Sequence, residues 1–354
     1  MDNGVLKRLR VVGGIAAVVG ALALGGCGSP AEEPAEPAAG PQSLEELIAA
    51  AEAEGELTWY TGTPPSTIEK VVEAFEATYD IRVNATRLPS GDIAQRFQAE
   101  IAADNVQVDV MSTVDQGFFG DMNDAGNLAS LPDLARGEVD DAQFLLGDYG
   151  VVVTVGVPAF GYNTSVMGDF TLDTWQDLLD ERVDGQLILV DPRGSQAWAQ
   201  MWHVALNHPD LGPDFLEKVG QQGHQVVNSG APGAELLGAG EGGVLVANIP
   251  GVFDAAKQAG APIEYMVPED PFYGIFTWAV VTADAPHPNA AALFLNFLAS
   301  EEGSQVYNTA DRGISPLGDL DGTWPTPAGG IEQPPTPDEL SASLEEILTL
   351  LQIR

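Results

Sequence analysis

The sequence predicts an α/β fold in which helices pack on the faces of mixed, mostly parallel sheets. Three observations predict it. Strand-like and helix-like patterns alternate from residue 43 to residue 111, the alternation resumes from residue 154 to residue 299, and the strand-like runs are short and rich in apolar residues. Such alternation is typical of parallel sheets wound with helices. No internal sequence repeat relates the two stretches.

The first stretch alternates three helices with three strands. A capping box, Ser43-Leu-Glu-Glu46, opens a helix that Gly55 closes, and a second box at Ser66–Glu69 opens the next helix. Apolar residues at helical spacing mark the helix faces, namely Ile68, Val71, Val72, Phe75 and Tyr79 on the second helix and Ile93, Phe97 and Ile101 on the third. The expected strands are Leu57–Thr61, Ile81–Leu88 and Val106–Met111.

The second stretch continues the alternation and ends in a tail. Its expected strands are Thr154–Tyr162, Gln186–Val190, Val244–Asn248, Ile263–Val267 and Phe276–Thr282, and its helices begin at Asp173, after Gly194, at Phe253 and at Asn289. From Pro316 to Pro337 the chain is rich in proline and glycine. A last helix follows, with Thr336 as its cap, Pro337 in its first position and Glu339 completing a capping box.

The first residues have the pattern of an export signal. Three cations between residues 7 and 10 precede an apolar run, Val11–Leu24, that is shorter than the roughly 20 residues needed to span a bilayer. Small residues then lead to Cys27, the only cysteine of the chain. We therefore expect a lipoprotein signal peptide at residues 1–26 and a lipid on the Cys27 thiol. The alternative is an ordinary signal peptide followed by an incidental cysteine.

Residues 27–42 contain no large apolar side chain until the first predicted helix, and proline, alanine and glutamate dominate them. Such a composition is expected to form a disordered tether. The sequence thus predicts an exported protein, anchored by its lipid to the outer face of the cell membrane or to the periplasmic side.

The charge is strongly acidic. The chain has 14 lysines and arginines against 52 aspartates and glutamates. Without residues 1–26, which hold three of the cations and one aspartate, 11 cations remain against 51 acids, a formal charge of −40. Such a surface repels nucleic acid and anionic lipid. The carboxylates are scattered over the predicted helix faces, which favours a solubility adaptation over the capture of cations.

Five segments together resemble a known family. They are the residues before Cys27, the opening Leu57-Thr-Trp-Tyr-Thr-Gly62, the strand Val108-Asp-Val-Met-Ser112, the turn Asp191-Pro-Arg-Gly-Ser195, and the helix Ala290–Gly303, which Gly313-Ile-Ser-Pro316 follows. Their order and spacing are similar to those of the type-2 periplasmic binding proteins of ABC transporters. The resemblance is to the branch that binds ferric iron, phosphonates, phosphate esters, thiamine or polyamines, and it covers nearly everything after residue 55.

The resemblance implies two α/β lobes that two crossover strands join and that close on a ligand like a hinged clamp. The crossovers are expected near Val155–Val157 and Ile275–Trp278. The implied limits are residues 43–155 for the first part of lobe 1, 156–276 for lobe 2, 277–325 for the return to lobe 1, and 326–354 for a proline-rich C-terminal segment and helix.

Open α/β sheets bind ligands beyond the carboxyl ends of their strands, where helix N-termini present free N–H groups. This rule selects polar residues at the ends of the predicted strands, and we include Asn228 and Ser229 with them; the set is Thr61, Gly62, Thr63, Ser112, Thr113, Arg193, Gly194, Ser195, Asn228, Ser229 and Asn248. We add Tyr273, which lies near the return crossover.

Each of these segments has an alternative interpretation. Thr61–Thr63, Ser112–Thr113 and Ser195 also suit turns and helix caps, and Arg193 also suits an ion pair with a neighbouring carboxylate. The large aromatic residues Trp198, Trp202 and Trp278 fit a core better than a surface on which a ligand stacks.

The resemblance raises the question of iron, since ferric members of the family hold Fe(III) with a His, a Glu and two adjacent Tyr. The corresponding positions here are Pro64, Val114 (or Asp115, if the register slips by one) and Ile249-Pro250, which supply no phenolate. The four histidines lack metal-ligand spacing; they are His203, His208, His224 and His287. We therefore expect no metal site and no cofactor.

The expected function is that of a monomeric solute-binding lipoprotein that captures a small organic anion, such as a phosphonate, phosphate ester or carboxylate, and delivers it to an ABC permease and its ATPase. Fixed dipoles and Arg193 are expected to hold the anion. Capture of ferric iron, an iron chelate or a polyamine is the alternative. A sensing lipoprotein is a second alternative. An enzyme is disfavoured because the sequence has no Gly-x-Ser-x-Gly elbow, cysteine nucleophile or metal-spaced His pair.

Overall fold

The computed structural model describes residues 41–354. The predicted signal peptide (1–26), the lipid-bearing Cys27 and all but the last two residues of the tether (27–42) lie outside the described residues and stay predictions. Within residues 41–354, no helix is both long enough and apolar enough to cross a bilayer.

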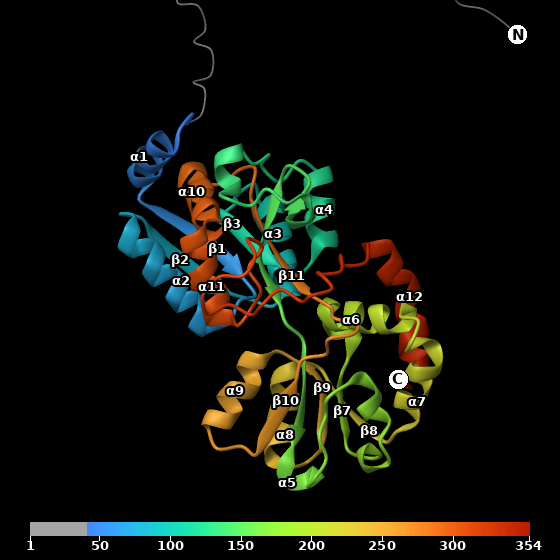
Figure 1. The fold of residues 1–354 in the computed structure, drawn as a ribbon. Helices are drawn as coiled ribbons and strands as arrows, with labels where there is room; N and C mark the ends of the chain where they lie inside the picture. The colour runs from blue at the N-terminus through green and yellow to red at the C-terminus, as the bar shows by residue number, and fades with distance from the viewer. Residues whose placement is uncertain (1–40) are drawn as a thin grey trace, which may run out of the picture. The chain divides into compact units, whose positions relative to one another are not determined.

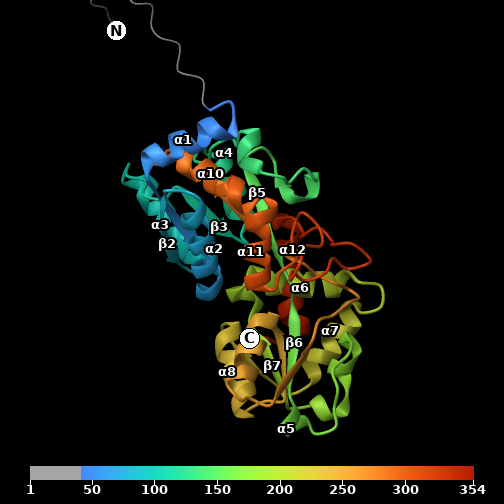
Figure 2. The same cartoon turned by 60° about the vertical axis from the view of Figure 1, so that its left-hand side comes forward.

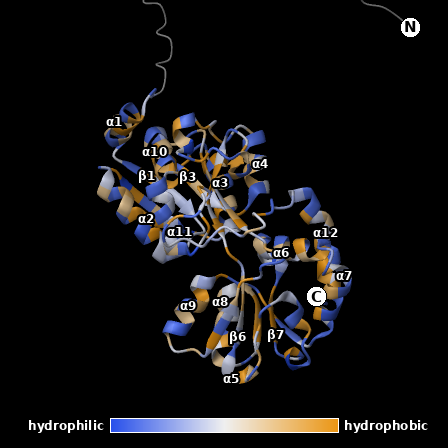
Figure 3. Ribbon diagram, in the orientation of Figure 1, coloured by the Kyte–Doolittle hydropathy of each residue, from blue (hydrophilic) through white to orange (hydrophobic). Residues whose placement is uncertain are grey.

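The first lobe is built on a six-stranded sheet with the order β2-β1-β3-β11-β5-β4. Its strands are β1 (Glu56–Thr61), β2 (Arg82–Arg87), β3 (Val110–Thr113), β4 (Leu145–Leu146), β5 (Gly150–Gly156) and β11 (Ile275–Val281). Its helices are α1 (Leu44–Glu54), α2 (Pro65–Thr78), α3 (Ser90–Ala102), α4 (Gln116–Asp124), α10 (Pro288–Leu298) and α11 (Glu301–Asp311), with short 3₁₀ turns at Asp133–Arg136 and Ala142–Phe144. The apolar faces of these helices cover the sheet (Figure 3).

The second lobe is built on a five-stranded sheet with the order β10-β6-β9-β7-β8. Its strands are β6 (Ala159–Asn163), β7 (Leu187–Val190), β8 (His224–Val227), β9 (Val244–Asn248) and β10 (Ile263–Met266). Its helices are α5 (Thr164–Met167), α6 (Gln196–Asn207), α7 (Gly212–Gln221), α8 (Gly230–Ala239) and α9 (Pro250–Gln258), with 3₁₀ turns at Trp175–Leu179, Glu181–Val183 and Pro192–Gly194.

The two lobes have separate hydrophobic cores. The chain passes from β5 to β6 through Val157-Pro158 and returns from β10 to β11 (Figure 1). The two crossing segments pair with each other where Ile275 of β11 lies opposite Gly156 of β5. This arrangement confirms the two-lobed α/β fold that the sequence predicts.

The C-terminal segment connects the lobes a third time. Trp324 N–H donates to the Gly313 carbonyl at 2.9 Å, and Ile331 packs against the core of lobe 1. The segment then forms α12 (Pro337–Leu350), which packs on α6 and α7 of lobe 2 (Figures 1 and 2). Ile347 and Leu351 are fully buried in the core of lobe 2. The helix therefore belongs to lobe 2, although the chain reaches it from lobe 1.

Several local predictions need correction. The second helix begins at Pro65 without a side-chain cap, because proline at the first helical position replaces the expected box at Ser66–Glu69. The run Thr154–Tyr162 divides into β5 and β6 at Pro158, which cannot donate to a strand partner. The helix expected from Asp173 is a 3₁₀ turn that a Thr174–Asp177 capping box opens.

The sheets are mixed, as predicted, but parallel pairing does not predominate. The pairs β1–β2, β1–β3, β7–β8 and β7–β9 are parallel. The other five pairs involve β4, β5, β6, β10 or β11 and are antiparallel. The reason is the connectivity, since β5, β6 and β11 carry the chain between the lobes and cross each sheet against the direction of its parallel strands.

Candidate functional site

The loops that follow β3 and β7 face each other across a cavity of about 540 Å³. The loop and helix after β3 contribute Asp115, Gly117, Phe118 and Asp121, with Ala94 from α3; lobe 2 contributes Pro192, Arg193, Gln196 and Ala199; and α12 contributes Pro337, Leu340, Ser341 and Leu344. Val114, directly after β3, packs against the core of lobe 2. The carboxyl ends of these strands therefore meet between the lobes, as the sequence predicts.

The hydroxyls expected to bind ligand in lobe 1 bond to one another instead. Trp59 Nε1–H donates to Ser112 Oγ at 2.9 Å, and Ser112 Oγ–H donates to Thr61 Oγ1 at 2.8 Å. Thr61 Oγ1 also accepts from the Thr63 N–H and lies 2.6 Å from Thr63 Oγ1. Thr63 Oγ1 in turn lies 2.6 Å from the Tyr307 hydroxyl on α11. We call this chain of five side chains the hydroxyl network.

The hydroxyl network has a definite direction from Trp59 to Thr63. The Trp59 indole can only donate, and Thr61 Oγ1 already accepts from Ser112 Oγ–H and Thr63 N–H, so the Thr61 hydroxyl must donate to Thr63. Between Thr63 Oγ1 and the Tyr307 hydroxyl, either oxygen can be the donor. All five side chains are at most 5% exposed. Thr61, Thr63 and Ser112 therefore lie in the interior of lobe 1, which corrects the expectation that they are free ligand donors.

The other polar residues after the strands of lobe 1 also bond within the protein. Thr113 is buried, and its hydroxyl donates to the hydroxyl of Ser90. The carboxylate of Asp115 caps α4 by accepting from the Phe118 N–H at 3.0 Å. Only Gly62 is exposed, so the backbone of this residue remains as the accessible part of the segment.

A partly buried acid lies beside the end of the hydroxyl network. Asp311 ends α11, four residues after Tyr307, and accepts from the Thr67 hydroxyl at 3.4 Å. Burial raises the pKa of the Asp311 carboxyl from its ordinary value of 3.8 to about 6. Burial also raises the pKa of the Tyr307 phenol, and the nearby Asp311 carboxylate adds to the rise. Removal from water thus dominates the electrostatics at this edge.

The predicted residues of lobe 2 lie at a more open edge. Gly194, Asn228 and Ser229 are exposed where β7 and β8 end. A Cβ on Gly194 would lie 3.1 Å from the Asn228 carbonyl oxygen, so the two loops touch. Ser195 precedes α6 and Ser229 precedes α8, and neither side chain caps its helix. The first N–H groups of both helices are therefore left without a side-chain acceptor.

Asn248 holds this edge together. Its Nδ2 donates to the Gly230 carbonyl at 2.9 Å, and its Oδ1 accepts from the Ile249 N–H at 2.9 Å. The side chain is 4% exposed. Asn248 thus ties the start of α8 to the end of β9 and positions the helix N-termini. This corrects the expectation that the Asn248 side chain is a free donor for a ligand.

Arg193 forms an ion pair, as one of the two interpretations of the sequence anticipated. Its Nη2 lies 2.7 Å from Asp191 Oδ2 and also donates to the carbonyl of Arg354 at 3.0 Å, while its Nε donates to both oxygens of Asp191. These hydrogen bonds hold the pKa of the Asp191 carboxyl below its ordinary value. The guanidinium would have to leave Asp191 before it balanced the charge of a ligand.

The predicted aromatic contact is a core residue. Tyr273 is fully buried, and its hydroxyl donates to Gln200 Oε1 in α6. Trp198, Trp202 and Trp278 are also buried, in agreement with the core interpretation. Tyr273 was expected at the cleft because it precedes the return crossover, but residues near a crossover also pack beneath it.

Sequence reasoning missed two residues close to the predicted segments. Arg87 ends β2 in register with Thr61, is exposed, and has no ion-pair partner within residues 41–354. Gln196 opens α6 and lines the cavity between the lobes. The rule that selected the other candidates passed over Arg87, because the predicted strand ran on to Leu88 and Arg87 lay inside it.

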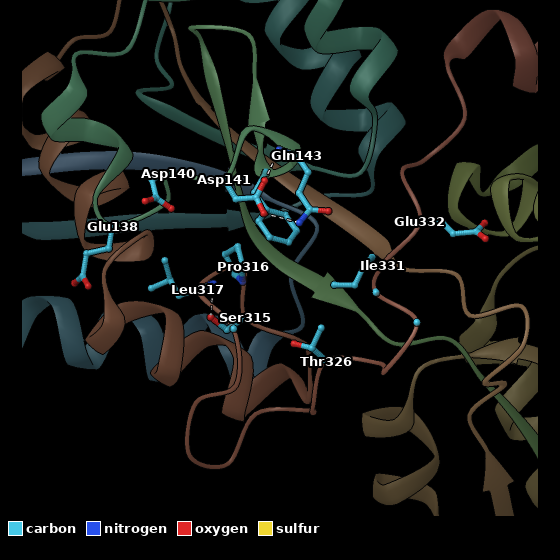
Figure 4. A pocket seen from close by; sticks show the side chains of 14 residues that line it. Glu138, Asp140, Asp141, Gln143, Ser315, Pro316, Leu317, Thr326, Ile331 and Glu332 are labelled. Carbon is cyan, nitrogen blue, oxygen red and sulfur yellow. Dashed lines mark hydrogen bonds between the residues drawn. The ribbon is translucent and has the colours of Figure 1, made fainter.

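A second cavity, of about 530 Å³, lies in lobe 1 away from these residues. The acidic residues around it are Glu138, Asp140, Asp141 and Glu332, and Figure 4 shows that the carboxylates of Glu138, Asp140 and Glu332 point away from one another. Asp141 accepts hydrogen bonds from Gln143. No group of His, Cys, Asp and Glu within residues 41–354 is arranged to hold a metal ion.

Comparisons with known proteins agree with this geometry. The sequence profile of a family described as bacterial extracellular solute-binding protein matches residues 70–318. No curated protein matches the sequence significantly.

Solved structures of similar fold include three substrate-binding or iron-bound proteins. A substrate-binding protein of an ABC transporter from Agrobacterium tumefaciens has a TM-score of 0.69 and 16% identity over 85% of this chain and 97% of that one. Iron-bound HitA from Pseudomonas aeruginosa has a TM-score of 0.65 and 20% identity, over 84% of this chain and 98% of that one. AfuA from Actinobacillus pleuropneumoniae, with fructose-6-phosphate bound, has a TM-score of 0.64 and 20% identity, over 85% of this chain and 99% of that one.

Proposed function

The chain belongs to the family of bacterial extracellular solute-binding proteins, and from this premise we propose that its solute is a small organic anion held between the two lobes. Proteins of this family bind a small ligand and work with ABC permease components; they are transport proteins rather than enzymes. The specific proposal concerns the charge and size of the ligand. A phosphonate, a phosphate ester or a carboxylate has the negative charge and the small size that we propose.

One observation carries the anion proposal: the carboxyl edge of lobe 2 presents helix N-termini. The first residues of α6 and α8 have no side-chain cap, and Gly194, Asn228 and Ser229 beside them are exposed. Free N–H groups and the helix dipole give such an edge a partial positive charge that favours anions. The net negative charge of the protein does not oppose this locally, because salt screens exposed charges beyond about 8–10 Å.

The ferric alternative has less support. Ile249 and Pro250 occupy the end of β9 and the start of α9, where ferric members of the family have two tyrosines, and they offer no oxygen donor. The buried tyrosines do not replace them, because burial raises the pKa values of Tyr273 and Tyr307 and keeps both phenols protonated. Iron-bound HitA shares the fold at 20% identity, a level that supports a common fold only.

The same proposal includes a lipid anchor on Cys27, a monomeric state and delivery of the solute to a permease and its ATPase. A lipid on Cys27, joined to the lobes by the tether of residues 27–42, would leave the lobes free to reach the permease. Replacing Cys27 with serine should abolish partitioning of the protein into a detergent phase. Continued partitioning would rule out the anchor.

A thermal-shift screen tests the anion proposal directly. Phosphonates, sugar phosphates, carboxylates, polyamines and ferric salts should be compared, since a ligand at about 100 times its dissociation constant adds about 2.7 kcal/mol of stability. We expect the largest shift from an organic anion. A shift produced only by polyamines or ferric salts would contradict the proposal.

Two arginines at the carboxyl ends of strands sharpen the test. Arg87 has no ion-pair partner within residues 41–354, whereas Arg193 is already paired with Asp191. We therefore expect Arg87→Ala to weaken binding of the anion by about ten-fold, or about 1.4 kcal/mol, and Arg193→Ala to weaken it by less than about three-fold. Isothermal calorimetry with the anion from the screen measures both. Equal losses would show that Arg193 leaves Asp191 to bind the ligand.

A further inference from the structure

One ion pair joins an element of lobe 1 directly to an element of lobe 2. Arg312 follows α11 in lobe 1, and its Nε lies 3.1 Å from Asp254 Oδ2 on α9 of lobe 2. The other oxygen of Asp254 accepts from the Tyr265 hydroxyl on β10 at 3.1 Å. The carboxylate is therefore fixed to lobe 2, while its partner is fixed to lobe 1.

Little else connects the lobes. Apart from the crossover strands and the C-terminal segment, no hydrogen bond or other ion pair within residues 41–354 runs from lobe 1 to lobe 2. The extensive packing of helices and strands against one another lies within the lobes. Besides the crossover strands, the C-terminal segment and the contact of Val114 with the core of lobe 2, the Arg312–Asp254 pair is thus the ion pair that fixes the relative position of the lobes within residues 41–354.

The backbone of Arg312 supports a specific role. It ends α11 in the left-handed conformation, with φ 56° and ψ 37°, and its N–H donates to the Asn308 carbonyl. Glycine is the usual residue in this position because it has no Cβ to strain the conformation. The guanidinium carbon lies 5.7 Å from the centre of the Trp324 ring, so the side chain is supported on one side by Trp324 and on the other by Asp254.

An ordinary surface ion pair would matter little for folding. The Arg312 and Asp254 side chains are 46% and 27% exposed, and pairs of this kind contribute weakly to the stability of a folded chain. The movement of one lobe against another is a different equilibrium, since both arrangements are folded and differ by few contacts. A weak pair present in only one arrangement changes the ratio of the two by about two- to five-fold.

We propose that Arg312 and Asp254 hold the lobes together and so slow the release of the solute. The first part of the proposal, that the pair holds the lobes together, concerns the hinge alone. The second part rests on the proposed function, because it assumes that the solute is bound between the lobes. Arg312 and Asp254 position the lobes and need not touch the solute.

Distances between spin labels on the two lobes test the first part without any solute. Labels on cysteines at Glu69 of α2 and Gln258 of α9, both exposed, report the separation in the full chain carrying Cys27→Ser. We expect Arg312→Gly to reduce, about two- to five-fold, the fraction of molecules in which the two labels are at the shorter distance. Glycine suits the left-handed backbone, so the variant removes the charge without endangering the helix end.

Three controls separate the pair from other effects. Asp254→Asn keeps an acceptor for the Tyr265 hydroxyl but should shift the distances as Arg312→Gly does. Lys257→Gln breaks the Lys257–Glu264 ion pair on the same helix, entirely within lobe 2, and should leave the distances unchanged. Exchanging the charges, as Arg312→Asp with Asp254→Arg, should restore the short distance.

Salt and solute complete the test. Raising sodium chloride to about 1 M shortens the screening length to about 3 Å and should move the distances of the unsubstituted protein toward those of Arg312→Gly. Identical distances in the two proteins would overturn the proposal. If Arg312→Gly separates the lobes and the solute from the screen dissociates two- to five-fold faster, both parts hold. Separated lobes with an unchanged dissociation rate would overturn the second part only, and neither result depends on the solute being an anion.

Discussion

In lobe 1 the edge of the sheet ends in hydroxyls that bond to one another, whereas in lobe 2 it ends in backbone groups and amides that face solvent. Thr61, Thr63 and Ser112 are buried in the hydroxyl network. Gly194 and Asn228 occupy the equivalent edge of lobe 2 and are exposed. Both edges follow the rule that polar residues gather after parallel strands.

The difference shows that a polar edge serves two purposes. Threonine and serine hydroxyls both donate and accept, so several of them in sequence satisfy one another without water. Glycine and the first turn of a helix have no such internal partner and remain available to a ligand. We infer that lobe 1 provides a rigid surface and that lobe 2 provides most of the recognition, and three variants test this division.

Removing one hydroxyl from the network should produce the largest effect. Thr61→Val deprives Ser112 Oγ–H and the Thr63 N–H of their acceptor and leaves both groups buried. We expect the free energy of unfolding to fall by about 2–3 kcal/mol, with little change in solute affinity. Urea denaturation measures the loss. Thr58→Val, in the same strand but half-buried, is the matched control and should change stability by less than about 0.5 kcal/mol.

The partly buried Asp311 of lobe 1 should give a smaller effect that depends on pH. Asp311 has a folded pKa of about 6, above its ordinary value of 3.8, so the folded state binds the proton more tightly than the unfolded state does. Its contribution to stability is present below pH 4 and is lost as the pH rises through 6. We expect Asp311→Asn to be more stable than the unsubstituted protein by about 1–2 kcal/mol at pH 8 and equal to it near pH 4.

Denaturation at several pH values checks this expectation for Asp311. The exposed carboxylate of Asp321 offers a control, since Asp321→Asn should not alter the dependence on pH. A difference between Asp311→Asn and the unsubstituted protein that stays constant from pH 4 to pH 8 would show that water reaches Asp311, and that the edge of lobe 1 is more open than the hydroxyl network indicates.

Crowding the edge of lobe 2 should affect binding more than folding. A side chain on Gly194 would lie against the Asn228 carbonyl, two residues before the start of α6. We expect Gly194→Val to weaken binding by about ten-fold, or about 1.4 kcal/mol. Gly91→Val is the matched control, because Gly91 lies in the first turn of α3 in lobe 1 and a Cβ there meets no atom within 4 Å. Equal losses from both variants, by calorimetry, would abolish the distinction between the lobes.

The fold was largely predictable because it follows from local patterns. Ser43 and Gly55 bound α1 as expected, and β9 spans the predicted Val244–Asn248. The helix α7 and the strand β8 were not predicted, since the exposed residues Gln225 and Val226 give the strand no alternating pattern. The antiparallel pairings also depend on partners that are distant in sequence, such as Val280 of β11 opposite Met111 of β3.

The candidate site was predictable in position but not in orientation. Thr61, Ser112, Gly194 and Asn228 all lie at the carboxyl ends of their strands, as the rule requires. What the rule omits is the partner that turns a side chain inward. For lobe 1 that partner is Tyr307, 244 residues after Thr63. A hydrogen bond between residues so far apart leaves no signal in either local sequence.

The path of the C-terminal segment also sets an order of assembly. Ile347, Leu351 and Ile353 complete the core of lobe 2, yet they are synthesised after every strand of both lobes. A chain emerging from a ribosome or a translocation channel can close the core of lobe 1 once Ile331 is out, whereas the core of lobe 2 lacks the last of its three side chains until residue 353 has emerged. Lobe 2, which carries the exposed helix N-termini, is therefore the later of the two lobes to become rigid.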